Sequence, residues 1–198
     1  MSISENPQVK SVIARARGLI LTPAAEWDRI AGEPASIRSL YVPYVLILAA
    51  IGPVCTMIGY AIFGYPMLGR VTHTGVFSLI GTAVVSYALN LLGVFLMALI
   101  IEAVSPYFGG VKDRMSAFKV AAYFPTAWWL ADVFNLFPPL AILSIVGFYS
   151  LYTLYVGLPK LMKAAEDKAV LFTVVVIIVA IIVYMMMEII GTAVGMPQ

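Results

Sequence analysis

The sequence predicts an all-α, polytopic membrane protein, a bundle of five transmembrane helices preceded by a short amphipathic cytoplasmic segment. Three observations lead to this fold class. Hydrophobic residues make up 62% of the 198 residues and charged residues only 11%, whereas soluble domains use roughly 45–50% apolar and 25% charged residues. Five apolar runs are long enough to span a bilayer, and basic residues fall almost entirely on one side of them. We expect an N-terminal segment, residues 1–39, and a membrane domain, residues 40–198.

The five apolar runs define the expected spans. A transmembrane helix needs about 20 mostly apolar residues, because only intrahelical hydrogen bonds satisfy its backbone in the hydrocarbon layer. The runs are Leu40–Phe63, Val76–Val104, Ala117–Phe137, Pro139–Leu158 and Ala169–Ile190. The third and fourth should form a hairpin closed by NLFPP. The third run is the weakest because it contains Lys119, Pro125 and Asp132, so a half-inserted third segment is the alternative to a full crossing.

The positions of Lys and Arg predict the orientation, because cytoplasmic loops carry an excess of basic residues. With five spans, every Lys and Arg except Arg70 falls on the side of the N-terminus. These residues are Lys10, Arg15, Arg17, Arg29, Arg38, Lys112, Arg114, Lys119, Lys160, Lys163 and Lys168. We therefore expect the N-terminus in the cytoplasm and the C-terminus outside.

The N-terminal segment contains two expected helices. In QVKSVIARARGLIL, apolar residues recur at helical spacing, and basic residues lie toward the other face. The apolar set is Val9, Val12, Ile13, Ala16 and Ile20. Thr22 and Pro23 then predict the start of a second helix, in which Trp27 would suit the headgroup level. The first helix is expected either to lie flat on anionic lipid or to pack against cytoplasmic loops of the same chain, unless the segment is largely unordered.

Three tyrosines mark the fourth run. Tyr149, Tyr152 and Tyr155 recur every third residue, so they share one face of a helix. A tyrosine hydroxyl within the bilayer needs a partner on another helix or in the headgroup region. Asn90 of the second run lies at about the depth of Tyr149, which favours a tyrosine face that points into the bundle. The alternative is a lipid-facing helix, which suits Tyr155 alone. Tyr123, Glu102 and Tyr155 are all expected near the cytoplasmic boundary.

Ionisable and polar residues within the runs predict a buried polar site made of Asn90, Glu102 and Asp132. Such residues are costly in lipid and usually face the bundle interior or a cavity. Asp132 lies near the outer end of the third run, where Arg70, His73 and Glu188 could reach it. A structural charge cluster is the plainer interpretation, and a proton or ion pathway is the bolder one.

Two prolines should shape the third and fourth helices. Pro125, within AAYFPTAWW, lacks a backbone N–H and is expected to kink the third span. Gly157 and Pro159 are expected to end the fourth helix, after which the chain turns through KLMKAAEDKA and crosses the membrane again.

The region 108–170 resembles the bacterial branch of the Ypt-interacting-protein (Yip) domain family. The resemblance rests on FGG, on FKVAAYFP, on the short proline-containing turn and on YSLYTLYVGLPKLMKAAEDKA, and TPAAEWDRIAGE resembles the family's N-terminal approach to the first span. It implies a five-span protein with a cytoplasmic N-terminus in a bacterial inner membrane. Eukaryotic relatives act in vesicle traffic and bind prenylated Rab-type GTPases. The short N-terminal segment here has no acidic Asp-Leu-Tyr-Gly-Pro stretch, which argues against carrying GTPase binding over.

Two functions from different classes follow. The first is a non-enzymatic scaffold that organises membrane lipids, copies of itself or another membrane protein. The second is a small transporter, channel or lipid-translocating protein that uses a polar site around Asp132. The expected partner- or lipid-binding positions are Tyr123, Pro125, Tyr149, Tyr152, Tyr155, Gly157 and Pro159. One cysteine, one histidine and no catalytic motif predict no metal, no cofactor and no enzyme activity. A net charge of +2 gives no reason to expect nucleic acid.

Overall fold

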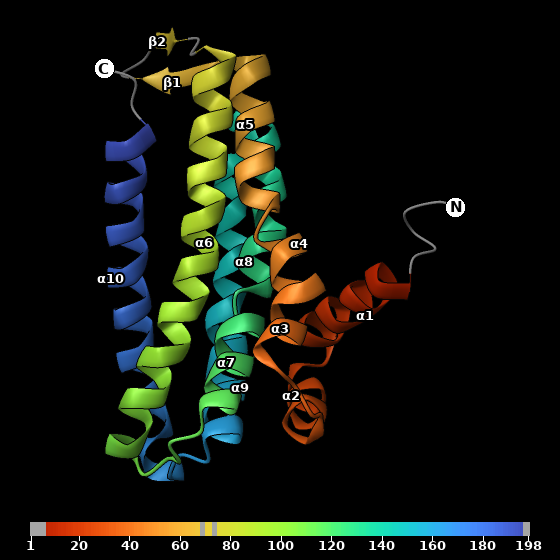
Figure 1. Cartoon of the computed structure of the whole chain (residues 1–198), viewed down its shortest axis with the longest axis vertical. Coiled ribbons are helices and arrows are strands. Elements are labelled where there is room, and N and C mark those ends of the chain that lie inside the picture. The colour runs from red at the N-terminus through yellow and green to blue at the C-terminus, as the bar shows by residue number, and fades with distance from the viewer. Residues whose placement is uncertain (1–6, 68–69, 73–74, 196–198) are drawn as a thin grey trace.

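The computed structural model describes residues 7–67, 70–72 and 75–195, and within them the chain is mainly helical (Figure 1). The N-terminal part comprises α1 (Pro7–Leu21), α2 (Pro23–Gly32), α3 (Ile37–Leu40), a π-helical turn (Tyr41–Val45), α4 (Leu46–Leu48) and α5 (Ile51–Phe63). A short antiparallel hairpin of β1 (Tyr65–Met67) and β2 (Arg70–Thr72) follows. The helical class is confirmed, whereas the hairpin was not expected.

The remaining chain supplies the rest of the bundle. It comprises α6 (Val76–Val104), a 3₁₀ turn (Ser105–Phe108), α7 (Arg114–Tyr123), α8 (Thr126–Ala131), two 3₁₀ segments (Asp132–Leu136 and Pro138–Phe148), α9 (Tyr149–Met162), a 3₁₀ turn (Glu166–Lys168) and α10 (Ala169–Gly195). α6 packs against α5, α7 and α10. We call the end of the bundle that holds the end of α6, the start of α7 and the end of α9 the basal end.

Four helical stretches in the described chain are long and apolar enough to cross a membrane. They are Ile37–Phe63, Val76–Phe108, Pro138–Met162 and Ala169–Gly191. The third expected span is instead divided into α7, α8 and a 3₁₀ segment. The division falls at Pro125, as predicted, because proline has no N–H to donate and its ring crowds the preceding turn.

The fourth helix does not end at Gly157-Leu158-Pro159, so that expectation was wrong. α9 continues to Met162, and Lys163 adopts a left-handed conformation with φ 51°. Pro159 lies in the last turn, where it removes only its own hydrogen bond. Its carbonyl oxygen accepts from the backbone N–H groups of both Lys163 and Ala164, which closes the helix one turn later.

The basal loops are tied to each other. The backbone N–H of Val111 donates to the carbonyl of Met162 (2.7 Å), and that of Ala165 donates to the carbonyl of Phe108 (3.3 Å). Phe108 stacks on Phe172 of α10, with ring centroids 5.0 Å apart. Gly109 has φ +73° and therefore needs the conformational freedom of glycine. The FGG sequence thus joins the loop before α7 to the loop before α10.

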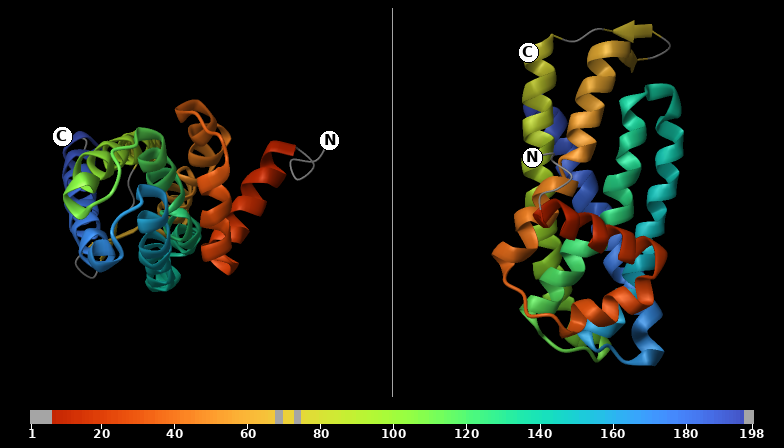
Figure 2. Two further views of the ribbon diagram at one scale, coloured as in Figure 1. Left: turned by 90° about the horizontal axis from the view of Figure 1, so that it is seen from below. Right: turned by 90° about the vertical axis from the view of Figure 1, so that its right-hand side faces the viewer.

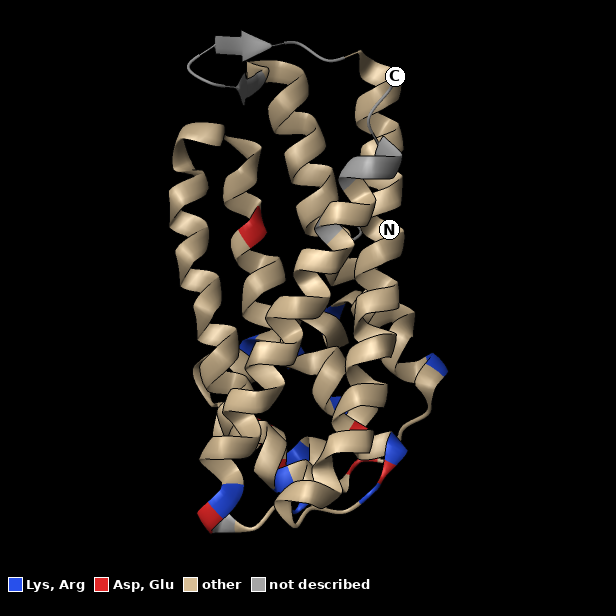
Figure 3. Cartoon of the chain, turned by 90° about the vertical axis from the view of Figure 1, so that its left-hand side faces the viewer, with Lys and Arg blue, Asp and Glu red and all other residues tan. Residues whose placement is uncertain are grey.

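The core lies in the basal half, where the N-terminal helices add a layer to the bundle (Figure 2). Large side chains such as Trp27, Phe118 and Leu158 are fully buried there. In the opposite half, apolar side chains such as Phe77 and Ile142 are exposed on the outer surface, as expected where lipid rather than water surrounds a helix. Figure 3 shows that charged positions gather toward the basal end.

Asp113 starts α7 as its N-cap, since its carboxylate accepts from the backbone N–H groups of Met115 (3.3 Å) and Ser116 (3.1 Å). The side-chain hydrogen bond from Ser116, together with these N–H groups, holds the pKa of Asp113 below its ordinary value. Stability from this cap should therefore be complete above about pH 5 and lost as the pH falls through the lowered pKa.

We expect Asp113→Ala to cost about 1 kcal/mol at pH 7, as loss of an N-cap usually does. The measurement is unfolding in mixed detergent micelles at pH 7 and at pH 3. The difference between wild type and variant should shrink at the lower pH. A difference of the same size at both values would show that the carboxylate does not cap α7.

Candidate functional site

The structure concentrates contacts between distant parts of the chain where the N-terminal helices meet the bundle. We call this region the docking site and define it by Arg15, Glu26, Trp27, Lys119, Tyr123, Gly157 and Lys160. α2 packs against α9, and α1 packs against α8 and the π-helical turn of the first span. Of the sequence-predicted positions, only Tyr123 and Gly157 belong to it.

Trp27 is the central side chain of the docking site. It is 0% exposed, so the expected position at the headgroup level was wrong. The indole ring occupies the space that a Cβ atom on Gly157 would fill. Its edge also contacts Tyr123, with centroids 6.4 Å apart and an interplanar angle of 76°. Gly157 therefore serves as a notch in α9 that admits a large ring from α2.

Arg15 joins α1 to α2 through charge. Its guanidinium pairs with Glu26 at 2.5 Å and also with Glu33, and it lies over the ring of Tyr123, 5.5 Å from the centroid. Glu26 is itself buried, and Arg29 approaches it at 3.4 Å. A buried carboxylate needs such pairing, because the desolvation of an uncompensated charge costs several kcal/mol.

Two lysines of the membrane domain hold the ends of α2. Lys119 of α7 is buried and donates to the carbonyl oxygens of Ile30 (2.8 Å) and Glu33 (2.6 Å), at the C-terminal end of α2. A cation suits this position because the last carbonyls of a helix lack intrahelical partners. Lys160 of α9 donates to the carbonyl of Ala24 (2.9 Å) and to the Asp28 carboxylate (2.6 Å).

The residues on either side of the helix break at Pro125 link the docking site to the first span. The hydroxyl of Thr126 donates to the carbonyl of Tyr123 (2.5 Å) and lies 2.7 Å from the hydroxyl of Tyr44. Because the one hydroxyl hydrogen of Thr126 goes to the carbonyl, Tyr44 donates to Thr126. The ring of Tyr44 also contacts that of Tyr123, with centroids 4.8 Å apart. Tyr123 thus contacts residues of α1, α2 and the first span.

The expected tyrosine face of α9 does not point into the bundle. Tyr152 is 50% exposed and Tyr155 is 46% exposed. Tyr149 does bond to another helix, but its hydroxyl donates to the carbonyl of Ile20 in α1 (2.9 Å) and not to Asn90. The exposed position of Tyr155 agrees with the alternative that the sequence left open.

The buried face of α9 combines small or polar residues with larger apolar ones. Ser150, Thr153 and Gly157 recur at helical spacing and are buried, together with Leu154, Leu158, Leu161 and Met162. The Ser150 hydroxyl accepts from the backbone N–H of Trp128 (2.9 Å). The Thr153 hydroxyl lies 2.8 Å from the carbonyl of Ser150 in its own helix and 3.1 Å from the carbonyl of Phe124. Small residues allow close helix approach in membranes, so this spacing was the available signal for the true interface.

The residues of the expected buried polar site lie apart. Glu102 is buried on α6 and pairs with Arg114 at 2.9 Å, near the basal end. Asn90 is half-buried on α6. Asp132 accepts from the side-chain amide of Asn135 (3.2 Å) and lies against α5, where a Cβ atom on Gly52 would meet its carboxylate at 2.6 Å. These residues therefore do not form one site.

The sequence predicted three neighbours for Asp132, namely Arg70, His73 and Glu188. His73 lies outside the described residues, and only the backbone is described at Arg70 and Glu188. Among described side chains, the Asn135 amide donates to Asp132, and the Ser144 hydroxyl lies 3.2 Å from the carbonyl oxygen of Ala131 and 3.5 Å from the amide oxygen of Asn135. This network joins the two arms of the hairpin that contains residues 132–148.

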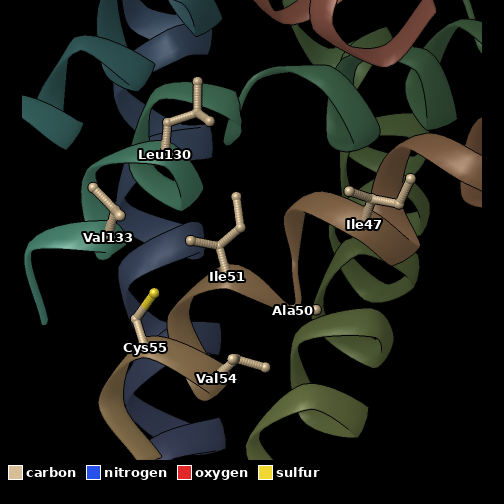
Figure 4. A pocket seen from close by; sticks show the side chains of 7 residues that line it. All are labelled: Ile47, Ala50, Ile51, Val54, Cys55, Leu130 and Val133. Atoms are coloured by element: carbon tan, nitrogen blue, oxygen red, sulfur yellow. The ribbon is translucent and has the colours of Figure 1, made fainter. Parts of the chain in front are cut away.

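An apolar groove of about 540 Å³ lies beside this hairpin (Figure 4). Its walls come from α4 and α5 on one side and from α8 and the following 3₁₀ segment on the other. The lining residues are Ile47, Ala50, Ile51, Val54, Cys55, Leu130 and Val133. The groove is not the polar cavity that the transport hypothesis requires near Asp132. Within the described chain, no cluster of three or more His, Cys, Asp or Glu could hold a metal ion.

The sequence of this chain matches a known protein family. The Yip1 domain matches residues 17–187, from the second half of α1 into α10. This chain belongs to the Yip1 domain family. The match includes α2 and every residue of the docking site except Arg15, so the Yip1 domain contains nearly the whole interface between the N-terminal helices and the bundle.

Two relatives of this Yip1-domain chain are the inner membrane protein YohC of Escherichia coli strain K12 and its counterpart in strain CFT073. Each is 27% identical over 161 residues, which cover 79% of this chain and 83% of the relative. No solved structure matched. The family resemblance inferred from FGG, FKVAAYFP and GLPK is therefore confirmed.

Proposed function

We propose that this protein is a non-enzymatic scaffold of the inner membrane that organises membrane lipids, copies of itself or another membrane protein. Membership of the Yip1 domain family and similarity to an inner membrane protein support this proposal. The observation that carries it is the docking site. There, the N-terminal helices and the bundle form one packed unit at the charged end of the molecule, which suits a surface for binding partners.

We further propose five crossings, with the N-terminus in the cytoplasm and the C-terminus outside. Residues 114–136 would complete the fifth crossing despite their breaks. At rises of about 1.5 Å per α-helical and 2.0 Å per 3₁₀ residue, this segment covers roughly 35 Å, enough for a hydrocarbon layer of about 30 Å. Phe137, just after the segment, contacts Phe63 at the far end of α5, with centroids 4.8 Å apart.

The proposed orientation rests on charge. Basic residues gather at the basal end, and such an excess is typical of the cytoplasmic side. The proposed partners are lipids and membrane proteins, including a second copy of this chain. We propose neither nucleic acid nor a GTPase as a partner. The net charge is only +2, and residues 1–39 contain no acidic Asp-Leu-Tyr-Gly-Pro stretch like that of eukaryotic relatives.

The scaffold proposal is tested by cross-linking in native membranes, followed by mass analysis in a mild detergent. We expect a complex of reproducible mass above the 21.4 kDa of one chain. Lys163→Glu/Lys168→Glu, which alters the exposed basal surface, should weaken the complex, whereas Phe77→Leu at the opposite end should not. Recovery of only the monomer, both in membranes and in detergent, would contradict a scaffold for copies of this chain or for another membrane protein.

A further inference from the structure

α1 has two chemically distinct faces. Val12, Ala16 and Leu19 are buried against the rest of the chain, and Arg15 points inward with them to Glu26. A separate stripe remains exposed on the opposite side, consisting of Lys10, Ile13, Ala14, Arg17 and Leu21. Ile13 is 57% exposed and Leu21 is 63% exposed. The buried face accounts for packing, but the exposed stripe has no role in the docking site.

We propose that this stripe, the outer face of α1, is a docking surface for anionic phospholipid headgroups of the cytoplasmic leaflet. The proposal names a lipid partner for the scaffold and in that respect rests on the proposed function. In this arrangement α1 is not an independent amphipathic helix on the membrane surface. Its inner face packs against the bundle, and its outer face contacts lipid.

The depth of α1 in the bundle supports the proposal. α1 packs against the π-helical turn Tyr41–Val45 and against α8, and the carbonyl of Ile20 accepts from Tyr149. These partners belong to apolar segments and not to the polar basal loops. Figures 1 and 2 show α1 beside α3 and α4, where the first span begins, whereas α2 extends further toward the basal end. The outer face of α1 therefore lies at the boundary of the bilayer.

The chemistry of the outer face fits this boundary. Ile13 and Leu21 can insert between headgroups and acyl chains, where exposed apolar side chains are stabilised. Lys10 and Arg17 have long stems that place their charges among the phosphates. A basic residue near an anionic surface contributes about 1 kcal/mol, or roughly fivefold in partitioning. The outward side of α2 differs, since it carries Ala25 beside both Asp28 and Arg29.

The test uses spin labels on single cysteines, in a Cys55→Ala background that removes the only native cysteine. Labels at Ile13→Cys and Leu21→Cys are compared with a control at Ala25→Cys on α2. The full-length protein is reconstituted in vesicles of phosphatidylcholine, with or without phosphatidylglycerol. Accessibility to oxygen, which concentrates in lipid, is compared with accessibility to a water-soluble nickel complex.

We expect labels at positions 13 and 21 to contact lipid more than the label at position 25, most strongly with phosphatidylglycerol. Lys10→Glu/Arg17→Glu should reduce this preference by roughly tenfold or more, while Arg38→Glu leaves it unchanged. Equal water accessibility at positions 13, 21 and 25 in both vesicles would overturn the proposal. Lipid contact that is the same with and without phosphatidylglycerol, and that charge reversal does not change, would overturn the proposed preference for anionic headgroups.

This outcome can be separated from that of the scaffold experiment. The labels report where α1 lies in a pure reconstituted protein, with no protein partner present. A lipid-contacting α1 in a strictly monomeric protein would contradict the protein-scaffold role alone. A stable oligomer with a water-exposed α1 would contradict the lipid-docking surface alone.

Discussion

Replacing Gly157 with Ala is expected to release the N-terminal helices from the bundle. The new Cβ atom would overlap the indole ring of Trp27, which is fully buried. Overpacking of this kind costs about 1–3 kcal/mol, and displacement of a buried tryptophan costs about 3–5 kcal/mol. We expect a loss near 3 kcal/mol, or roughly hundredfold in the ratio of docked to undocked molecules. Limited trypsin digestion at Arg29 measures that ratio.

The matched control is Gly93→Ala, the same substitution on α6, where a Cβ atom meets nothing within 4 Å. It should leave digestion unchanged and, because Ala favours helix over Gly, stabilise the protein by up to about 1 kcal/mol. Combining Gly157→Ala with Trp27→Leu should cost less than the sum of the single changes, since the smaller side chain relieves the overlap. Additive costs would mean that Trp27 does not occupy the notch.

The second large effect is expected from Arg15→Met. The substitution keeps much of the side-chain volume but leaves the buried carboxylate of Glu26 with only the longer contact to Arg29. Removing one partner of a buried pair costs about 3–5 kcal/mol. We expect a value near 3 kcal/mol because the Arg15 side chain keeps 16% exposure. Chemical unfolding in mixed micelles and trypsin digestion should both report the loss.

Arg17→Met provides the comparison on the same helix, since Arg17 is exposed on the outer face. In detergent its effect should stay within about 0.5 kcal/mol. Adding Glu26→Gln to Arg15→Met should recover part of the loss, because a neutral amide is less costly to bury than an unpaired carboxylate. Equal effects of Arg15→Met and Arg17→Met would contradict the inward position of Arg15.

The membrane segments were largely predictable from the sequence because hydropathy over about 20 residues is a strong signal. The runs beginning near Leu40, Val76, Pro139 and Ala169 correspond to the four long helical stretches. Pro125 correctly marked the break in the third run, since the missing N–H of proline acts locally. Pro159 misled because the same defect is tolerated in a last turn that closes through the carbonyl of Pro159 itself.

The faces of the helices were less predictable, because they depend on partners far away in the chain. The buried face of α1 is rotated from the expected one, so that Ile13 is exposed and Arg15 turns inward to the buried carboxylate of Glu26. On α9, the regular spacing of the tyrosines suggested an interface, but the notch at Gly157 admits Trp27 and sets the buried face. Trp27 and Gly157 are 130 positions apart, so their fit produces no periodic pattern in the sequence.

Lys119 illustrates the same difficulty. Because Lys119 lies within the third apolar run, it weakened the prediction of a third span. Its charge was used only to predict the orientation. Its ammonium group in fact binds the terminal carbonyls of α2. With Lys160 at the other end of α2, it fixes a helix that precedes the first span to two helices of the membrane domain. The resemblance to the Yip family covered these residues without indicating what they contact.

The contact between α2 and α9 also constrains the number of membrane crossings. One cross-linking measurement tests both the contact and the number of crossings. Between Asp28 and Lys160 the chain contains four segments, residues 37–63, 76–108, 114–136 and 138–162. Asp28 and Lys160 can lie on the same side of the membrane only if the number of crossings between them is even. Residues 114–136 must therefore cross the membrane as the other three segments do. In the Cys55→Ala background, Asp28→Cys and Lys160→Cys should be joined by a short thiol cross-linker in intact membranes, whereas Asp28→Cys and Phe77→Cys should not. Losing this exposed ion pair costs at most about 1 kcal/mol, so docking persists. A missing link between positions 28 and 160, with both thiols reactive, would contradict the docking of the N-terminal helices and remove the support that docking gives to five crossings.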